Sequence, residues 1–255
     1  MDITARTVFI VGATSGIGRE LARRFAAAGS TVIVGGRRTT ALAELETEGF
    51  DTAVIDVADS ASVASARDDV LASHPSLDTV VTMAGLMAME DLRDPSHYAI
   101  AETMVNTNLL GTIRVVGAST PHLIEQGRGA FVTVTSGIAF LPFPPMASYA
   151  ATKAGVHAYS EALRVQLADA GIEVVELVPP AVRTHAESVN PQALDLGDFA
   201  ADVMSLLART PTPPEILVEA VQMHRWAEKN GTYDALVAQR ATMLSNLRAR
   251  SAPSA

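Results

Sequence analysis

The sequence alternates between short runs rich in β-branched residues and longer amphipathic segments, and this alternation strongly constrains the fold. The short apolar runs, at 7–11, 31–34, 53–55, 79–82, 130–135 and 173–178, predict buried strands. The segments 17–28, 39–48, 60–73, 106–126 and 148–170 predict helices. Strands joined by helices of this length pair in parallel and are covered on both faces. The sequence therefore predicts an α/β fold built on a doubly wound parallel sheet.

Composition narrows the class of protein. The chain has 255 residues, of which 48% are apolar, and a formal charge of −9. This length and apolar content predict a single globular domain over 1–255 and exclude a disordered chain. The absence of cysteine excludes disulfides and thiol nucleophiles. The acidic balance disfavours nucleic acid as a partner, and we find no long apolar run that would span a membrane and no cleavable leader. We therefore expect a cytoplasmic protein without nucleic-acid or membrane partners.

Glycines follow the first predicted strand and precede the first predicted helix. Glycine at such a turn permits a tight bend and a close approach of the backbone to a pyrophosphate. The N–H groups and the dipole of the helix that follows then favour the phosphate charge. A plain turn would explain the glycines alone, but their place between a strand and a helix favours nucleotide binding. The predicted cofactor-binding residues of this loop are Gly12, Thr14, Ser15, Gly16, Ile17 and Gly18.

The end of the second predicted strand indicates which dinucleotide is bound. A carboxylate there would bind the ribose 2′-hydroxyl of NAD, but this chain has Arg37 and Arg38. Because an arginine fork can hold a phosphate bidentately, NADP is the better prediction and NAD the less favoured one. After the third strand, Asp56 could accept the adenine amino group while Val57 packs on the ring. The alternatives are two solvated arginines and an ordinary helix N-cap region.

A tyrosine and a lysine lie four residues apart near the start of a predicted helix, so both project from one face. An ammonium group near the phenol of Tyr149 would lower its pKa, as proton transfer to or from a carbonyl requires, and Lys153 supplies that group. Ser136 follows the fifth strand, where its hydroxyl could stabilise charge on a substrate oxygen. Asn108 lies inside a predicted helix, although asparagine has low helix propensity. Taken singly, the last two are more often a turn serine and a helix-surface asparagine.

These motifs together resemble the short-chain dehydrogenase/reductase family, whose fold is a Rossmann fold. The matching positions run from about residue 5 to 185 in family order: Gly12-x-x-x-Gly16-Ile17-Gly18, Asp56-Val57, Ala84-Gly85, Asn108, Ser136, Tyr149-x-x-x-Lys153 and Thr184. The resemblance implies that Tyr149 is the acid/base and that Ser136 polarises the carbonyl. It implies that Lys153 also holds the nicotinamide ribose, and that Asn108 binds a water linking Lys153 to solvent.

Further cofactor contacts follow from the same resemblance. They are Ala84, Gly85, Pro179, Val182 and Thr184, besides Tyr149 and Lys153 themselves. The family usually has Pro-Gly after the sixth strand, where this chain has Pro179-Pro180. Hydride would pass directly between nicotinamide and substrate carbon, so no metal is expected. The histidines, at 74, 97, 122, 157, 185 and 224, show no ligand spacing, which agrees with this expectation.

The last part of the chain departs from the family pattern. Residues 231–255 are expected to form a strand and a helix without the usual aspartate–glycine–glycine ending, and with the double proline they resemble the DltE-like subgroup. Residues 185–210 are expected to form a short helical substrate lid. The family suggests a homo-oligomer, as a dimer or tetramer, with a dimer built on the helices of Asn108 and Tyr149.

The apolar segment 138–146 would suit a hydrophobic ketone or secondary alcohol, or would only pack beneath a lid. The sequence therefore predicts an NADP-dependent oxidoreductase that acts on a hydrophobic carbonyl compound. The alternatives are an NAD-dependent alcohol dehydrogenase and, from another class, a non-catalytic regulator that senses NADP.

Overall fold

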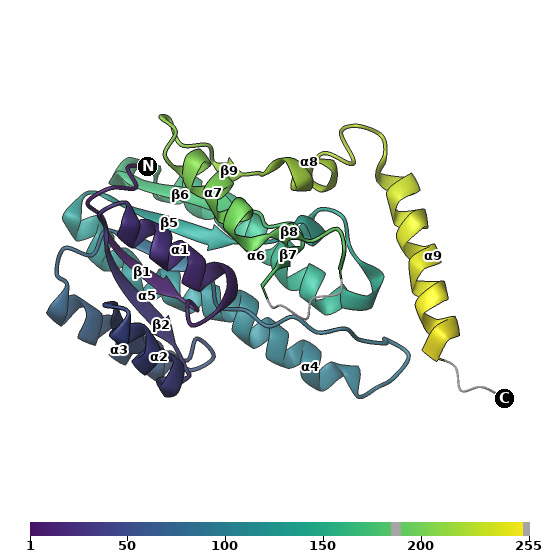
Figure 1. Cartoon of the computed structure of the whole chain (residues 1–255), viewed down its shortest axis with the longest axis horizontal. Helices are drawn as coiled ribbons and strands as arrows, with labels where there is room; N and C mark the ends of the chain where they lie inside the picture. The colour runs from purple at the N-terminus through teal and green to yellow at the C-terminus, as the bar shows by residue number, and fades with distance from the viewer. Residues whose placement is uncertain (185–189, 252–255) are drawn as a thin grey trace.

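A parallel sheet forms the centre of the molecule in the computed structural model, which describes residues 1–184 and 190–251 (Figure 1). In this described part, seven strands pair in the order β3-β2-β1-β4-β5-β6-β9, all parallel. Their bounds are β1 Thr7–Val11, β2 Thr31–Gly36, β3 Asp51–Val54, β4 Thr79–Thr82, β5 Gly129–Val134, β6 Ile172–Leu177 and β9 Glu215–Ile216. The predicted doubly wound α/β fold is confirmed, with small shifts at several strand ends.

Helices cover both faces of the sheet. The bounds of the α-helices are α1 Gly16–Ala27, α2 Thr39–Thr47, α3 Ser60–Ser73, α4 His97–Met104, α5 Gly111–Gln126, α6 Ala147–Gln166, α7 Leu196–Leu207, α8 Glu219–Arg225 and α9 Tyr233–Ser251. Shorter elements are the π-helix η1 Val105–Leu110 and the 3₁₀ turns η2 Gly137–Ala139, η3 Pro144–Met146 and η4 Ala168–Ala170. The strands β7 Val182–Arg183 and β8 Leu194–Asp195 pair with each other in a separate two-stranded sheet.

Two apolar cores, one on each side of the sheet, explain why β1 is apolar on both of its faces. In β1, Val8 and Ile10 join one core, whereas Phe9 and Val11 join the other, because successive side chains point to opposite faces. Helices α1, α2 and α7 supply the first core, and α3, α5 and α6 supply the second. Among the described residues, no helix is both long and apolar enough to cross a bilayer.

The C-terminal region corrects one prediction. The strand expected at the start of 231–255 does not form, since α9 occupies Tyr233–Ser251, and the strand beside β6 is β9, at 215–216. No residue of segment 231–237 is buried, so it does not supply the apolar faces of a sheet strand, whereas Ile216 is fully buried beside Leu177 of β6. Helix α9 follows α8 after a loop and lies at one end of the molecule (Figure 1).

The long helix predicted over 106–126 begins earlier than expected. The helical run starts at His97, and a π-helical stretch over Val105–Leu110 separates α4 from α5. A π-helix widens the local turn and is frequent at functional sites, and this one contains Asn108. The low helix propensity of Asn108 therefore coincides with a real irregularity in the helix.

Candidate active site

The glycine loop joins β1 to α1 at the carboxyl edge of the sheet, where the strand order reverses between β1 and β4. Gly12 has φ +95°, and a Cβ there would lie 2.4 Å from the backbone nitrogen of Ala84. A Cβ on Gly18 would lie 2.7 Å from the carbonyl oxygen of Gly12. Only glycine fits these positions, so the turn brings the N-terminus of α1 directly over the strand ends.

The N-terminus of α1 suits a phosphate group. Its N-cap residue, Ser15, makes no side-chain hydrogen bond to the helix, so the first backbone N–H groups keep their capacity to bind a ligand. Arg38 donates from Nη2 to Thr14 Oγ1 at 3.0 Å and to Ser15 Oγ at 3.2 Å, which brings a guanidinium group to the loop. The side chain of Thr184 lies next to Gly16, as expected of two residues around one ligand. This donor set fits a dinucleotide.

The residues predicted for the adenosine end lie together, with one difference. Arg37 Nη1 is 3.7 Å from Asp56 Oδ2, and the other oxygen of Asp56 accepts a hydrogen bond from the N–H of Ala58. Arg37 is 57% exposed and can turn toward a ligand. Val57, in contrast, is buried, and a Cβ on Gly111 of α5 would lie 2.7 Å from its Cγ2. Its side chain therefore packs against α5 and leaves little surface for an adenine ring.

Three predicted catalytic side chains meet at the start of α6. The hydroxyl of Ser136 lies close enough to the Tyr149 phenol to affect its pKa, although Tyr149 comes from α6 and Ser136 from the segment just after β5. Lys153, one turn further along α6, is 4% exposed and donates from Nζ to the carbonyl oxygen of Val134 at 2.8 Å. Its Nζ lies 5.7 Å from the centre of the Tyr149 ring.

The pKa of Tyr149 differs from the sequence-based expectation. Burial raises the pKa of Tyr149 to about 12, and the nearby hydroxyl of Ser136 opposes this rise. Burial also lowers the pKa of Lys153 to about 8. Desolvation therefore outweighs any stabilisation of the phenolate by the ammonium group in the protein alone. At neutral pH the phenol carries its proton and the lysine is mostly charged.

Asn108 is completely buried, and its amide is engaged by the protein. Its Oδ1 accepts a hydrogen bond from Leu86 N–H at 2.7 Å, and its Nδ2 donates to Leu86 O at 2.8 Å and to Thr152 Oγ1 at 3.1 Å. The structure thus assigns Asn108 to holding the backbone after β4. The sequence did not indicate these contacts, because the bonds with Leu86 use main-chain groups and Thr152 is 44 positions away in the chain.

The residues expected around the nicotinamide come from the segment after β6. The carbonyl oxygen of Pro179 accepts a hydrogen bond from Gly137 N–H at 2.9 Å, so this turn is tied to the residue that follows Ser136. Val182 lies in β7, and Gly85 lies near the amide of Asn108. In the predicted lid, residues 185–189 lie outside the described residues, and α7 forms most of the remainder.

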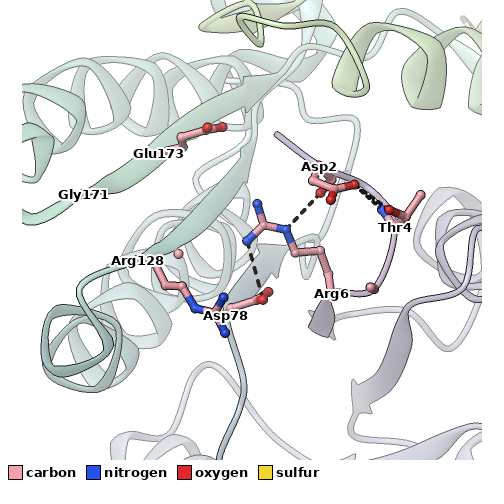
Figure 2. A pocket seen from close by; sticks show the side chains of 9 residues that line it. Asp2, Thr4, Arg6, Asp78, Arg128, Gly171 and Glu173 are labelled. Atoms are coloured by element: carbon pink, nitrogen blue, oxygen red, sulfur yellow. Dashed lines mark hydrogen bonds and ion pairs between the residues drawn. The ribbon is translucent and has the colours of Figure 1, made fainter.

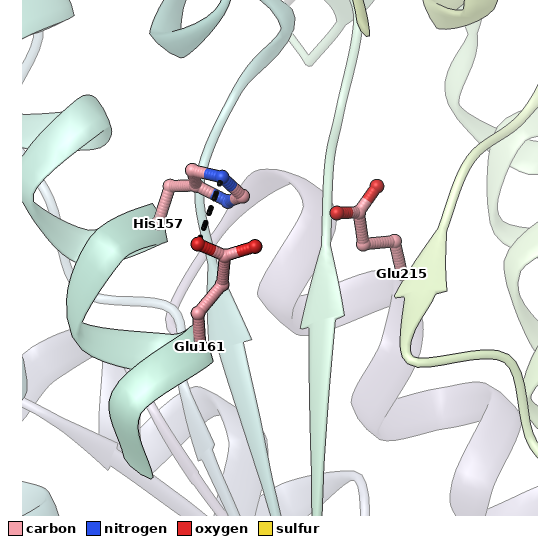
Figure 3. Close-up of side chains that lie close together, drawn as sticks. All are labelled: His157, Glu161 and Glu215. Atoms are coloured by element: carbon pink, nitrogen blue, oxygen red, sulfur yellow. Dashed lines mark ion pairs between the residues drawn. The ribbon is translucent and has the colours of Figure 1, made fainter. Parts of the chain in front are cut away.

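One group of possible metal ligands occurs among the described residues, in the cluster His157, Glu161 and Glu215 (Figure 3). The buried carboxylate of Glu176 bonds His157 Nδ1 at 2.8 Å, and Arg225 bonds both oxygens of Glu215. Since protein groups already pair these ligands, the cluster functions as an ion-pair network between α6, β6 and β9. The expectation that no metal takes part stays a prediction.

A depression lies at the opposite edge of the sheet, near the amino ends of β4, β5 and β6 (Figure 2). The volume of this depression is about 330 Å³. Arg6 fills part of it, pairing with Asp78 at 3.5 Å and donating to the carbonyl oxygen of Asp2 at 3.0 Å. Ligands of doubly wound sheets bind at the carboxyl edge, so this depression is not the candidate active site.

A family comparison agrees with this geometry. The family model described as short chain dehydrogenase matches residues 6–194, well over half of the chain. The chain belongs to the short-chain dehydrogenase family. The family predicted from the motifs is therefore confirmed, and the protein is an NAD(P)-dependent dehydrogenase or reductase that acts on alcohol or carbonyl groups.

Individual relatives of this short-chain dehydrogenase are moderately similar. It is 36% identical over 187 residues to the "Uncharacterized oxidoreductase DltE" of Bacillus subtilis, covering 72% of this chain and 74% of that protein. It is 35% identical over 220 residues to "Sulfoacetaldehyde reductase 2" of Chromohalobacter salexigens, covering 84% and 86%. A solved gluconate 5-dehydrogenase from Burkholderia cenocepacia, in complex with NADP and tartrate, is 30% identical with a TM-score of 0.65, covering 71% and 73%.

Proposed function

We propose that this short-chain dehydrogenase uses NADPH to reduce a hydrophobic ketone or aldehyde, with Tyr149 as the proton donor. The observation that carries the proposal is the arrangement of three side chains: Tyr149, which is partly buried, lies near Ser136 and one helical turn from the buried Lys153, whose Nζ is 5.7 Å from the Tyr149 ring. With a pKa of about 12, this phenol is protonated throughout the neutral range. Reduction of a carbonyl requires a proton donor, and the protonated phenol of Tyr149 can supply that proton.

Each residue has a defined task in this proposal. Ser136 Oγ orients the substrate oxygen next to Tyr149, and the phenol gives its proton to that oxygen as negative charge develops there. The charged Lys153 lies close enough to favour the phenolate that results, since an opposite charge stabilises the ionised form. The bound nicotinamide cofactor supplies the hydride. Asn108 holds Leu86 beside these groups, and its role in a water relay stays a prediction.

The arginines after β2 support NADP rather than NAD. Arg38 already donates to the glycine loop, and the exposed Arg37 is free to turn from Asp56 toward a 2′-phosphate. The related gluconate 5-dehydrogenase was solved with NADP, which is compatible with this proposal. Replacing Arg37 by Asp should weaken NADPH binding and leave NADH binding less affected. Equal affinity of the natural protein for NADPH and NADH would contradict the cofactor assignment.

Apolar side chains near the catalytic residues support a hydrophobic substrate. Segment 138–146 begins two residues after Ser136, and the ring of Phe140 in it packs against His157 and Arg225. Arg240 of α9 donates to the carbonyl oxygens of Leu141 and Pro142, which ties this segment to the C-terminal helix. Met87 and Met89, on the segment after β4, are each 65% exposed. We propose that the remainder of the lid, 190–210, closes over the same region.

The test is turnover of NADPH with a panel of aliphatic and aromatic ketones and aldehydes, including an anionic aldehyde. Tyr149→Phe should lower kcat by about 10²- to 10⁴-fold, the range for loss of a general acid. Tyr159→Phe is the matched control, because Tyr159 lies on the same helix and outside the site. Unchanged turnover in Tyr149→Phe would refute the proton donor. Binding of NADPH without turnover of any substrate would favour a regulator, and faster alcohol oxidation with NAD would favour the alternative dehydrogenase.

We also propose that the enzyme is a homodimer located in the cytoplasm. Large apolar side chains are exposed along the helices expected at the dimer interface, at Tyr98, Val105, Leu110, Ile124 and Val165. A dimer would remove this surface from water. Light scattering of the purified protein measures its mass, and a monomer at micromolar concentration would contradict this part of the proposal.

A further inference from the structure

A carboxylate far away in the sequence binds the first turn of the catalytic helix. The segment 83–96 joins β4 to α4 without regular secondary structure, and Glu90 lies in its middle. Both carboxylate oxygens of Glu90 accept hydrogen bonds from Ser148, one from its backbone N–H and the other from its hydroxyl, the latter at 2.9 Å. The backbone N–H of Glu90 donates to the carbonyl oxygen of Pro145 at 2.8 Å. Glu90 therefore contacts the chain on both sides of the point where α6 begins.

This contact substitutes for a local helix cap. Met146, the N-cap residue of α6, makes no side-chain hydrogen bond to the helix, so the first N–H groups of α6 need partners from elsewhere. A carboxylate at this position satisfies one of these groups and also complements the positive end of the helix dipole. Glu90 is only partly exposed, so water competes less for its oxygens than at an open surface.

The first turn of α6 is the part of the helix on which Tyr149 depends. Tyr149 directly follows Ser148, whereas Lys153 is held further along by Val134 O and by its burial. A loosened first turn would therefore displace the phenol more than the ammonium group. Segment 83–96, which carries Glu90, is also held near its start, where the side-chain amide of Asn108 bonds the main chain of Leu86. Two anchors thus fasten 86–90 on either side of the exposed Met87 and Met89.

We propose that Glu90 is a positioning residue for Tyr149, acting through Ser148 and the first turn of α6. The proposal rests on the proposed function, in which Tyr149 donates the proton. The effect is one of geometry, since a displacement of about 1 Å at a reacting group can cost up to about a hundredfold in rate. Cofactor binding is not involved, because Glu90 lies apart from the glycine loop in the chain and contacts α6 and Pro145.

Two variants separate geometry from charge. Glu90→Gln keeps an oxygen that can accept from the N–H of Ser148, and its amide can donate to the hydroxyl, so the cap survives without the charge. Glu90→Ala removes the cap. Glu44→Ala is the matched control, because the exposed side chain of Glu44 makes no hydrogen bond or ion pair within the described part of the chain.

We expect Glu90→Ala to lower kcat about ten- to hundredfold, with the dissociation constant of NADPH within about twofold of the natural value. Glu90→Gln should recover kcat to within about threefold, and Glu44→Ala should match the natural protein. Amide hydrogen exchange, followed by mass spectrometry, should be faster in peptides containing residues 147–151 in Glu90→Ala, but not in Glu90→Gln. This exchange measurement does not require turnover.

The outcomes distinguish the two proposals. If the natural protein turns over carbonyl compounds but Glu90→Ala has normal kcat or normal exchange in the first turn, the positioning role is refuted and the proposed function stands. If Glu90→Gln loses as much kcat as Glu90→Ala, the geometric role is also refuted. If no carbonyl compound is reduced while the exchange difference between the two variants is present, the proposed function fails and the anchoring of this turn by Glu90 is supported.

Discussion

Replacing the buried lysine of the site should stabilise the protein at neutral pH while removing its activity. Lys153 is 4% exposed, and burial lowers its pKa from 10.5 to about 8. This change corresponds to about 3 kcal/mol of destabilisation of the folded state when the lysine is charged. In Lys153→Met this cost is absent, but the carbonyl oxygen of Val134 loses its donor, which costs about 1 kcal/mol. At pH 7 the variant should therefore be about 2 kcal/mol more stable than the natural protein.

The sign of the stability difference between Lys153→Met and the natural protein changes with pH. Below pH 8 Lys153 is charged in both the folded and the unfolded chain, so the full cost of the buried charge is present. Between pH 8 and 10.5 the unfolded chain binds more protons than the folded one, so the stability of the natural protein rises with pH. Above pH 10.5 the cost is gone and only the lost hydrogen bond distinguishes the proteins. The variant should then be about 1 kcal/mol less stable.

Urea unfolding of the cofactor-free proteins at pH 7 and pH 10.5 tests this prediction, since bound cofactor would add its own stabilisation. The informative quantity is the change, by about 3 kcal/mol, in the stability difference between variant and natural protein. Lys229→Met is the control, because Lys229 is exposed and lies over the Trp226 ring. A Lys153→Met variant that is destabilised equally at both pH values would refute the reasoning.

Other changes have equally defined outcomes. Gly12→Ala should abolish cofactor binding and destabilise the protein by at least about 1 kcal/mol, measured by calorimetric titration and by denaturation, because its Cβ would meet the Ala84 backbone at 2.4 Å. His157→Gln should cost more stability at pH 5.5 than at pH 9. The hydrogen bond with Glu176 raises the pKa of His157, so its contribution is complete below pH 6.5 and lost as pH rises through the folded pKa; equal costs at the two pH values would contradict this. Arg38→Ala should raise KM for NADPH about tenfold and leave KM for NADH nearly unchanged; a parallel rise for both would argue against a 2′-phosphate contact.

Local patterns in the sequence were sufficient to predict the parallel sheet and the order of the site residues along the chain. The β-branched runs, with helices between them, allow only parallel pairing and right-handed connections, so the doubly wound parallel sheet followed from general rules, whereas the strand order came from the structure. The glycine loop was predictable because positive φ at Gly12 and close approach at Gly18 leave no other residue type. The tail was mispredicted as a strand by analogy with the family, because the place beside β6 is decided by burial in the packed fold, where Ile216 is buried and no residue of 231–237 is.

The pKa values of the site could not be predicted from spacing. The four-residue interval between Tyr149 and Lys153 indicated that they share a face of one helix. This suggested that the charge of Lys153 would decide the pKa of Tyr149. Burial dominates instead, and burial depends on how β5, β6 and the segment after Ser136 pack around the helix. The same holds for the contact of Glu90 with Ser148, which joins residues 58 positions apart.

The amino-acid sequence by itself determined that this chain folds as a doubly wound sheet with a glycine turn, a serine, a tyrosine and a lysine at its carboxyl edge, because backbone sterics and hydrophobic periodicity act over a few neighbouring residues. Only the tertiary structure decided that the phenol keeps its proton, that Asn108 holds a backbone segment, and that a distant glutamate binds the catalytic helix. The physical reason is that desolvation and long-range hydrogen bonds depend on which groups the packed chain places side by side.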